Sequence, residues 1–245
     1  MFDAILAAVV RHRRPILVAG LLVAGGNAAA MGYAPDVARA SPLPLLFLLA
    51  LTFLLLAIIS MGTRPAALVV LPQDAAFASP VPAWRILLTL GLLGQTSTTV
   101  GAYLRSTEAG IATKFDVVVA LLWLVLIALL VAAAWRGHSV RLSPDGVRML
   151  GLLGSRTIPW EAGPRFEALS NDMRPPMRLP LTIANPALMR RRGLVGRPAI
   201  PVDGVQPRFL ASVINHYVAH PDRRAAIGTP DEYRRLVAHL HGTAG

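Results

Sequence analysis

The chain has 245 residues, of which 54% are hydrophobic and only 15% are charged, and its mean hydropathy is +0.55. These values lie on the membrane side of ordinary composition. The chain contains no cysteine, which excludes disulfides, thiolate catalysis and metal sites with cysteine ligands. The net charge of +11 is uneven, because residues 1–135 hold eight Lys and Arg against five Asp and Glu, whereas residues 136–245 hold sixteen against eight.

Residues 1–14 form a basic N-terminal segment that we expect on the cytoplasmic side. Apolar residues of its first ten positions share one helical face, which predicts a short helix lying along the inner membrane surface. A cluster of Arg11, Arg13 and Arg14 follows. The next apolar stretch, ending at the small residues 28–30, also has the features of a cleaved signal peptide. We favour an uncleaved span, because three further apolar stretches follow.

Four stretches without any charged residue have about the ~20 residues that cross a bilayer. They predict spans at about 15–34, 43–62, 85–104 and 116–135, in a transmembrane domain of residues 15–136. Basic residues are more frequent near one side of these spans than near the other, and such an excess marks cytoplasmic flanks. The sequence therefore predicts a multi-pass protein of the bacterial inner (cytoplasmic) membrane with both termini in the cytoplasm.

Between their flanking charged residues, the predicted spans contain no acidic, basic or histidine side chain, and their polar residues gather in two places. The third span carries Gln95 and Thr98 in the stretch "GLLGQTSTTVG", and the first span carries Asn27 among small residues. Small residues let helices approach closely, and amide side chains hydrogen-bond across such contacts. We interpret Asn27, Gln95 and Thr98 as intramembrane helix contacts. A substrate path lined by Gln95 is the alternative. The proline-rich loop 64–85 is not expected to form a further span. Its two alternatives, a place along the membrane surface and contact with the C-terminal domain, stay open.

From residue 137 onwards the pattern changes to alternating apolar and polar residues, typical of strands. The turn "SPDG" between two such stretches predicts a hairpin over residues 140–149. Further strands are predicted at 155–160, 165–169, 177–184 and 197–203, the last at an edge because of its prolines. An amphipathic helix is predicted from Pro207 to Pro221, and a second helix begins where Thr229 caps it.

The stretch from Leu142 to Val147, the stretch "RTIPW" from Arg156 to Trp160, and the apolar stripe from Phe209 to Val218 carry a family resemblance. With them, residues 138–220 resemble the bacterial pleckstrin-homology-like (PH-like) domains of small actinobacterial membrane proteins. That resemblance implies a cytoplasmic β-rich domain over residues 137–245 that serves binding or scaffolding and has no catalytic centre.

Two clusters in this half contain residue types that are typical of binding sites. His216 and His220 have the i, i+4 spacing of a shared metal site, with Asp222, His239 and His241 as further ligands. We interpret them as surface histidines and predict no metal, because no adjacent glutamate completes a metalloprotease motif. The second cluster is the candidate site for anionic headgroups or a partner protein: Arg190, Arg191, Arg192 and Arg197.

The predicted fold class is therefore membrane α-helical, with four transmembrane helices, plus a small cytoplasmic PH-like β domain with C-terminal helices. The predicted function is that of a non-enzymatic scaffold or adaptor that binds protein or lipid headgroups. The alternative is an accessory subunit of a transport or export system with a polar path around Gln95. The expected partners are anionic inner-leaflet headgroups and an unknown protein, with a possible homo-oligomer. No cofactor and no nucleic acid is expected.

Overall fold

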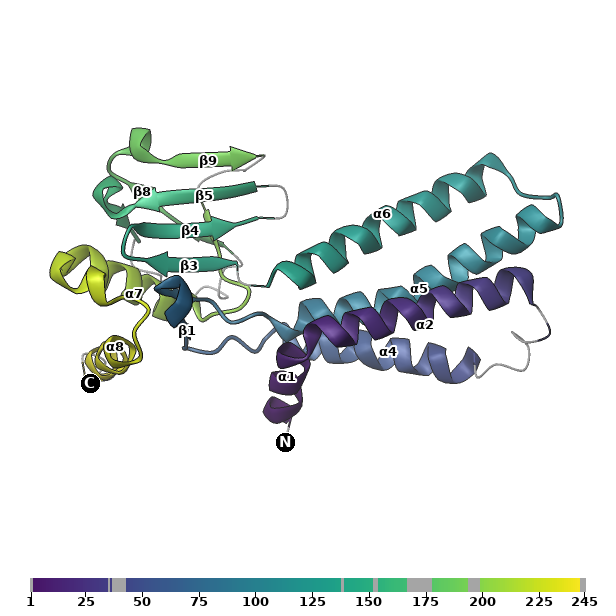
Figure 1. Ribbon diagram of the computed structural model, residues 1–245, viewed down its shortest axis with the longest axis horizontal. Helices are drawn as coiled ribbons and strands as arrows, with labels where there is room; N and C mark the ends of the chain where they lie inside the picture. The colour runs from purple at the N-terminus through teal and green to yellow at the C-terminus, as the bar shows by residue number, and fades with distance from the viewer. Residues whose placement is uncertain are drawn as a thin grey trace. The chain divides into compact units, whose positions relative to one another are not determined.

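The computed structural model describes residues 2–34, 36, 43–137, 139–151, 154–166, 178–193 and 199–242. The chain divides into two compact units (Figure 1): a helical unit formed by Met1–Thr63 and Pro82–Arg136, and a β unit formed by Arg64–Val81 and Gly137–Gly245. Residues 64–81, for which the sequence left open the membrane surface and contact with the C-terminal domain, belong to the β unit. This unit is therefore assembled from two separate parts of the chain.

The helical unit is organised around its least apolar long helix. That helix, α5, packs against α2, α4 and α6. Because neighbours cover it on several sides, α5 buries the hydroxyl side chains of Thr89, Thr96 and Ser97. The helices of this unit are α1 (Phe2–Arg11), α2 (Arg13–Tyr33), α4 (Leu43–Ser60), α5 (Ala83–Glu108) and α6 (Lys114–Arg136).

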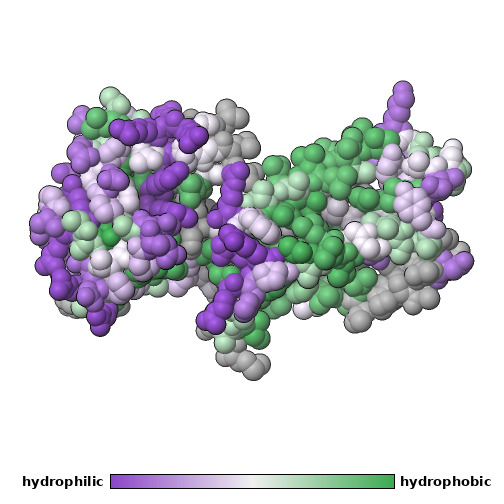
Figure 2. Space-filling model, in the orientation of Figure 1, coloured by the Kyte–Doolittle hydropathy of each residue, from purple (hydrophilic) through white to green (hydrophobic). Residues whose placement is uncertain are grey.

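The helices around α5 turn large apolar side chains outward. Leu22, Ile58, Phe115 and Leu122 are each more than 60% exposed, and Figure 2 shows a broad hydrophobic face over the helices. Monomeric soluble proteins rarely expose an apolar surface of this extent, and such surfaces mark membrane or protein contacts.

The prediction of four transmembrane helices is wrong. By length and composition, two helices of the described residues can cross a membrane, Arg13–Tyr33 and Lys114–Arg136. In each of them only 17% of the apolar window is buried. The part of α4 whose side chains are described, Leu46–Ser60, is shorter than the ~20 residues that cross a bilayer. The helix α5 is long enough, but its run of Gln, Thr and Ser lowers its hydropathy. The two qualifying helices indicate membrane association.

The β unit is dominated by one antiparallel sheet. Its strand order is β1-β2-β3-β4-β5-β9, and two short strand pairs, β6-β8 and β7-β10, accompany it. The strands are β1 (Val69–Leu71), β2 (Ala76–Ala78), β3 (Val140–Ser143), β4 (Gly146–Leu150), β5 (Gly154–Pro159), β6 (Pro164–Arg165), β7 (Arg178–Pro180), β8 (Thr182–Ile183), β9 (Arg190–Gly193) and β10 (Ala199–Pro201).

The hairpin predicted around "SPDG" is confirmed. Strands β3 and β4 pair with Val140 opposite Met149 and Ser143 opposite Gly146. The Ser143 hydroxyl donates to the carbonyl oxygen of Gly146 at 3.1 Å, which closes the turn. Alternation along the hairpin puts Val140, Leu142, Val147 and Met149 into the core, as expected for a sheet with one buried face.

The segment 64–81 supplies β1 and β2, which form the end of the sheet opposite β9. Strand β2 pairs with β3, with Ala78 opposite Arg141, and Phe77 is fully buried. The Phe77 ring lies 5.5 Å from the ring of Tyr233 and 6.5 Å from that of Tyr217. The backbone N–H of Leu68 donates to the Tyr233 hydroxyl at 3.0 Å. These contacts make the segment part of the core.

The predicted C-terminal helices are also confirmed. The stripe of α7 (Pro207–Ala219) buries Leu210, Val213, Ile214 and Tyr217 against the sheet core. Helix α8 (Pro230–Gly242) begins after Thr229, whose hydroxyl oxygen accepts from the backbone N–H of Glu232 at 3.3 Å. Short 3₁₀ turns connect the elements: η1 (Pro72–Asp74), η2 (Trp160–Ala162), η3 (Pro186–Leu188) and η4 (Pro221–Ala226).

Candidate functional site

The basic cluster forms an exposed strand of the β unit. Arg190, Arg191 and Arg192 lie on β9, at one end of the strand order, and all four residues of the strand are exposed. Arg197 lies outside the described residues. The sequence did not predict this strand, because a strand exposed on both faces shows no apolar alternation. Three consecutive arginines thus stand along a sheet edge, on which charged side chains also block edge-to-edge pairing.

A fourth arginine lies beside this strand but is buried. Arg156 on β5 is opposite Arg191 on β9, and only 1% of Arg156 is exposed. Burial, and then the neighbouring charge of Arg191, lower the pKa of the Arg156 guanidinium from its ordinary value. In the sequence, Arg156 stands out only as the first residue of the PH-like stretch "RTIPW". Arg156 lies two residues before the buried Ile158, and residues two apart in a strand share a face. This spacing was the sequence pattern that indicated an inward-pointing Arg156.

The positive charge on and beside β9 is suited to an anionic ligand. Arginine forks match the geometry of phosphate and carboxylate oxygens and bind them in bidentate fashion. The exposed arginines of β9 are accessible to such a group, and Arg156 adds positive charge at the same place in the sheet. The arrangement can hold phosphate-bearing headgroups. No side chain of it is placed for nucleophilic or acid–base chemistry.

The polar residues of the helical unit differ in whether they hydrogen-bond to another helix. The Asn27 amide nitrogen on α2 donates to the Ser97 hydroxyl on α5 at 2.9 Å, so Asn27 does join two helices. The Thr98 hydroxyl donates within α5 to the carbonyl oxygen of Gln95 at 2.8 Å. Gln95 itself is exposed, and its side chain makes no hydrogen bond within the described residues. All three predicted residues line one cavity of about 410 Å³. A transport path around Gln95 stays a prediction.

Three histidines approach one another where α7 and α8 meet. The His216 ring stacks on the His220 ring at 4.5 Å between centroids, and the His239 ring lies 4.9 Å from that of His216. The His220 Nδ1 donates to the carbonyl oxygen of His216 at 2.9 Å. Asp222 is exposed, and the His241 side chain lies outside the described residues. Among the described residues, no three His, Cys, Asp or Glu are grouped so that they could hold a metal ion.

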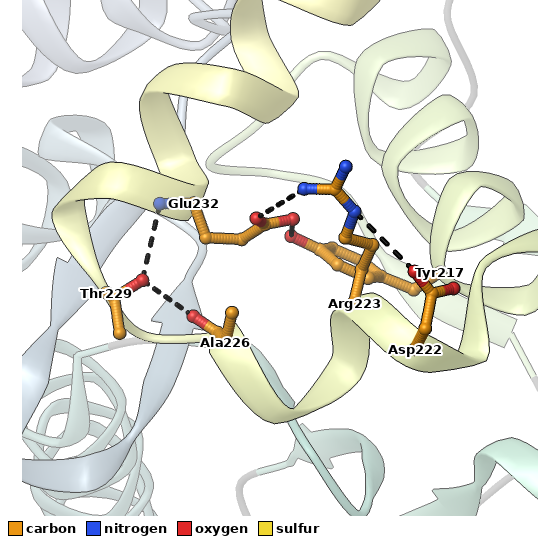
Figure 3. Close-up of polar contacts among 6 residues, drawn as sticks. All are labelled: Tyr217, Asp222, Arg223, Ala226, Thr229 and Glu232. Atoms are coloured by element: carbon orange, nitrogen blue, oxygen red, sulfur yellow. Dashed lines mark hydrogen bonds and ion pairs between the residues drawn. The ribbon is translucent and has the colours of Figure 1, made fainter.

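A buried carboxylate, Glu232 on α8, makes polar contacts with residues of α7 and η4 (Figure 3). The Tyr217 hydroxyl donates to Glu232 Oε1 at 3.5 Å, and the Arg223 guanidinium lies 3.6 Å from Glu232 Oε2. Burial, and then the charge of Glu232, raise the pKa of Tyr217 above its ordinary value. This network joins α7, η4 and α8. Its signal in the sequence was Glu232, three residues after the capping Thr229.

Comparisons of the chain with protein-family models, with curated proteins and with solved structures found no match. The features of the described residues that bear on function are the exposed arginines of β9, the apolar helices and the cavity at Gln95.

Proposed function

We propose that the chain is a non-enzymatic membrane protein whose β unit binds anionic lipid headgroups through β9. The observation that supports this proposal is the exposure of Arg190, Arg191 and Arg192 on a strand at one end of the sheet. Near a membrane surface each such charge contributes about 1 kcal/mol of attraction to anionic lipid. Anionic phosphate is therefore the ligand class that this surface suits best.

The proposal places the protein in the bacterial cytoplasmic membrane, with both termini in the cytoplasm. Arg11, Arg13 and Arg14 stand where α1 ends and α2 begins, and Arg136 and Arg141 stand at and after the end of α6. A surplus of arginine at these two helix ends favours their cytoplasmic placement. Only three residues separate the end of α6 from β3, so the chain tethers the β unit to that helix end.

The PH-like resemblance supports a binding role and stays part of the proposal. The residues that carry it lie on β3, β4, β5 and α7, which share one core. An amphipathic helix packed on antiparallel strands suits a module whose edges and loops contact a ligand. In PH-like proteins of this kind we expect binding without catalysis.

Headgroup binding can be tested with the full chain in lipid nanodiscs. The chain lacks cysteine, so a Ser155→Cys variant takes a single fluorophore on β5, opposite Arg192. Nitroxide-labelled lipids should quench this fluorophore strongly in discs that contain phosphatidylglycerol and weakly in discs of pure phosphatidylcholine. Replacing Arg190, Arg191 and Arg192 by Gln should shift the docking equilibrium by roughly 100-fold, since each arginine contributes about 1 kcal/mol.

The matched control removes the same charge elsewhere in the β unit. Arg208, Arg234 and Arg235 are exposed on α7 and α8, and replacing them by Gln should leave most of the quenching intact. Equal quenching in the two kinds of disc, or equal loss in both triple variants, would show that β9 is not a headgroup site.

A further inference from the structure

The helical unit contains a cavity of about 410 Å³ between α2 and α4, with α5 as its floor. Both α2 and α4 pack closely against α5 but make little contact with each other within the described residues. Glycines set these approaches: a Cβ on Gly20 would lie 2.7 Å from Leu90, and one on Gly94 would lie 2.8 Å from Ala50. The packing on α5 thus holds the two outer helices apart, and the cavity lies between them.

The walls of the cavity are apolar along most of their length. The described residues that line it include Leu, Ile, Val, Phe, Ala and Gly side chains from all three helices, and none of these lining residues is acidic, basic or histidine. A volume of this size falls in the range of about 300–1,000 Å³ that small-molecule sites occupy. A charged ligand would have no counter-charge in this lining.

The polar side chains gather on the α2 and α5 walls. Asn27 and Ser97 are joined by their own hydrogen bond, and the Thr98 hydroxyl is used within α5. The Gln95 amide, which also lines the cavity, has no hydrogen-bond partner among the described residues. An amide that loses water without gaining a partner costs free energy. The Gln95 amide can both donate to and accept from a ligand.

We propose that this cavity binds an uncharged amphiphile, with its hydrocarbon chain between α2 and α4 and its carbonyl or hydroxyl head at Gln95. The apolar walls suit the chain, the free amide suits a neutral hydrogen-bonding head, and the lack of charge in the lining disfavours an ionic one. A helix of a second copy does not fit inside: a helix about 10 Å wide that crosses a ~30 Å core fills on the order of 2,000 Å³.

The binding can be measured by native mass spectrometry on the full chain released from mild detergent, with 1-monooleoylglycerol as the probe. We expect one monooleoylglycerol to bind per chain, saturably, and at least tenfold more tightly than oleoyl-lysophosphatidylglycerol, whose head is anionic. Gln95→Leu should weaken the binding of monooleoylglycerol roughly fivefold, the effect of one neutral hydrogen bond.

A matched pair of variants on α2 locates the site. Ala24 lines the cavity and Ala29 is exposed on the same helix outside it, so Ala24→Phe should abolish binding and Ala29→Phe should leave it unchanged. Circular dichroism of both variants checks that the helices persist. Equal binding by both variants, equal affinity for the anionic lysolipid, or a dimer that Ala24→Phe dissociates in place of a lipid complex would each overturn the proposal. None of these results depends on the arginines of β9.

Discussion

The surroundings of His216 lower the pKa of its imidazole ring. Loss of solvent lowers the pKa of His216 first, and the nearby His220, His239 and Arg223 lower it further, whereas Asp222 acts in the opposite direction. These groups come from η4, from α8 and from His220, which lies between α7 and η4. The folded state therefore holds His216 neutral to a lower pH than the unfolded chain does.

The stability of the β unit should consequently fall in mild acid. The unfolded chain takes up the proton near the ordinary histidine pKa of 6.5, while the folded chain takes it up only at lower pH. The unfolding free energy is then highest above pH 6.5 and decreases as the pH falls below it. Melting temperatures from intrinsic tryptophan fluorescence across this range should show the decrease, and His216→Phe should remove much of it.

The control for this titration is His12→Gln, since His12 belongs to the helical unit. That variant should keep the dependence of the native chain on pH. If the melting temperature of His216→Phe decreases in acid as steeply as that of the native chain, His216 is not the group responsible.

Among the elements, the turn between η4 and α8 makes a close backbone contact with a segment far away in sequence. Gly228 has a φ of +95°, and a Cβ there would collide with the backbone of Ala75 and Ala76 between η1 and β2. This contact fixes the start of α8 against the segment 64–81. The absence of a side chain at Gly228 therefore serves the docking of two elements far apart in sequence.

We expect Gly228→Ala to destabilise the β unit by more than the ~1–2 kcal/mol that a left-handed conformation costs an L-residue, because backbone must move as well. Gly163→Ala is the matched control: its φ is +63°, but its Cβ would meet only the Ala184 side chain, at 3.1 Å. Denaturant titration of both variants gives the comparison. Equal losses would show that the contact with Ala75 and Ala76 adds nothing.

The assembly of the β unit from two chain segments has a consequence for any attempt to isolate it. Residues 137–245 alone lack β1 and β2, and with them the fully buried Phe77. Removing a core phenylalanine side chain typically costs about 3–5 kcal/mol, a large part of the stability of a small domain. We expect the fragment 137–245 to unfold without a cooperative thermal transition.

A fusion that restores the segment should recover the fold. Ala78 on β2 is opposite Arg141 on β3, so a short Gly/Ser linker can join residue 81 to residue 137 in place of α5 and α6. The fused chain should melt cooperatively by circular dichroism, and a Phe77→Ala version of it should melt earlier. A fragment 137–245 as stable as the fusion would contradict this expectation.

The sequence by itself determined what local chemistry controls. The turn Ser143–Gly146 with its flanking alternation, the apolar stripe of α7 and the Thr229 cap of α8 are each set by residues a few positions apart, and each forms as predicted. The long apolar stretches likewise form helices, and two of them are apolar and long enough to cross a membrane.

Only the tertiary structure decided which distant segments pair. No local signal brings residues 64–81 into the sheet, because the pairing of β2 with β3 joins strands separated by two long helices. The sequence of β9 shows no alternation of apolar residues, so the position of its arginines beside Arg156 follows from strand pairing alone. The cavity at Gln95 exists because α2 and α4 both pack on α5 and, within the described residues, make little contact with each other. The packing of these helices depends on the surfaces of all three, so the residue pattern of any one helix does not predict the cavity.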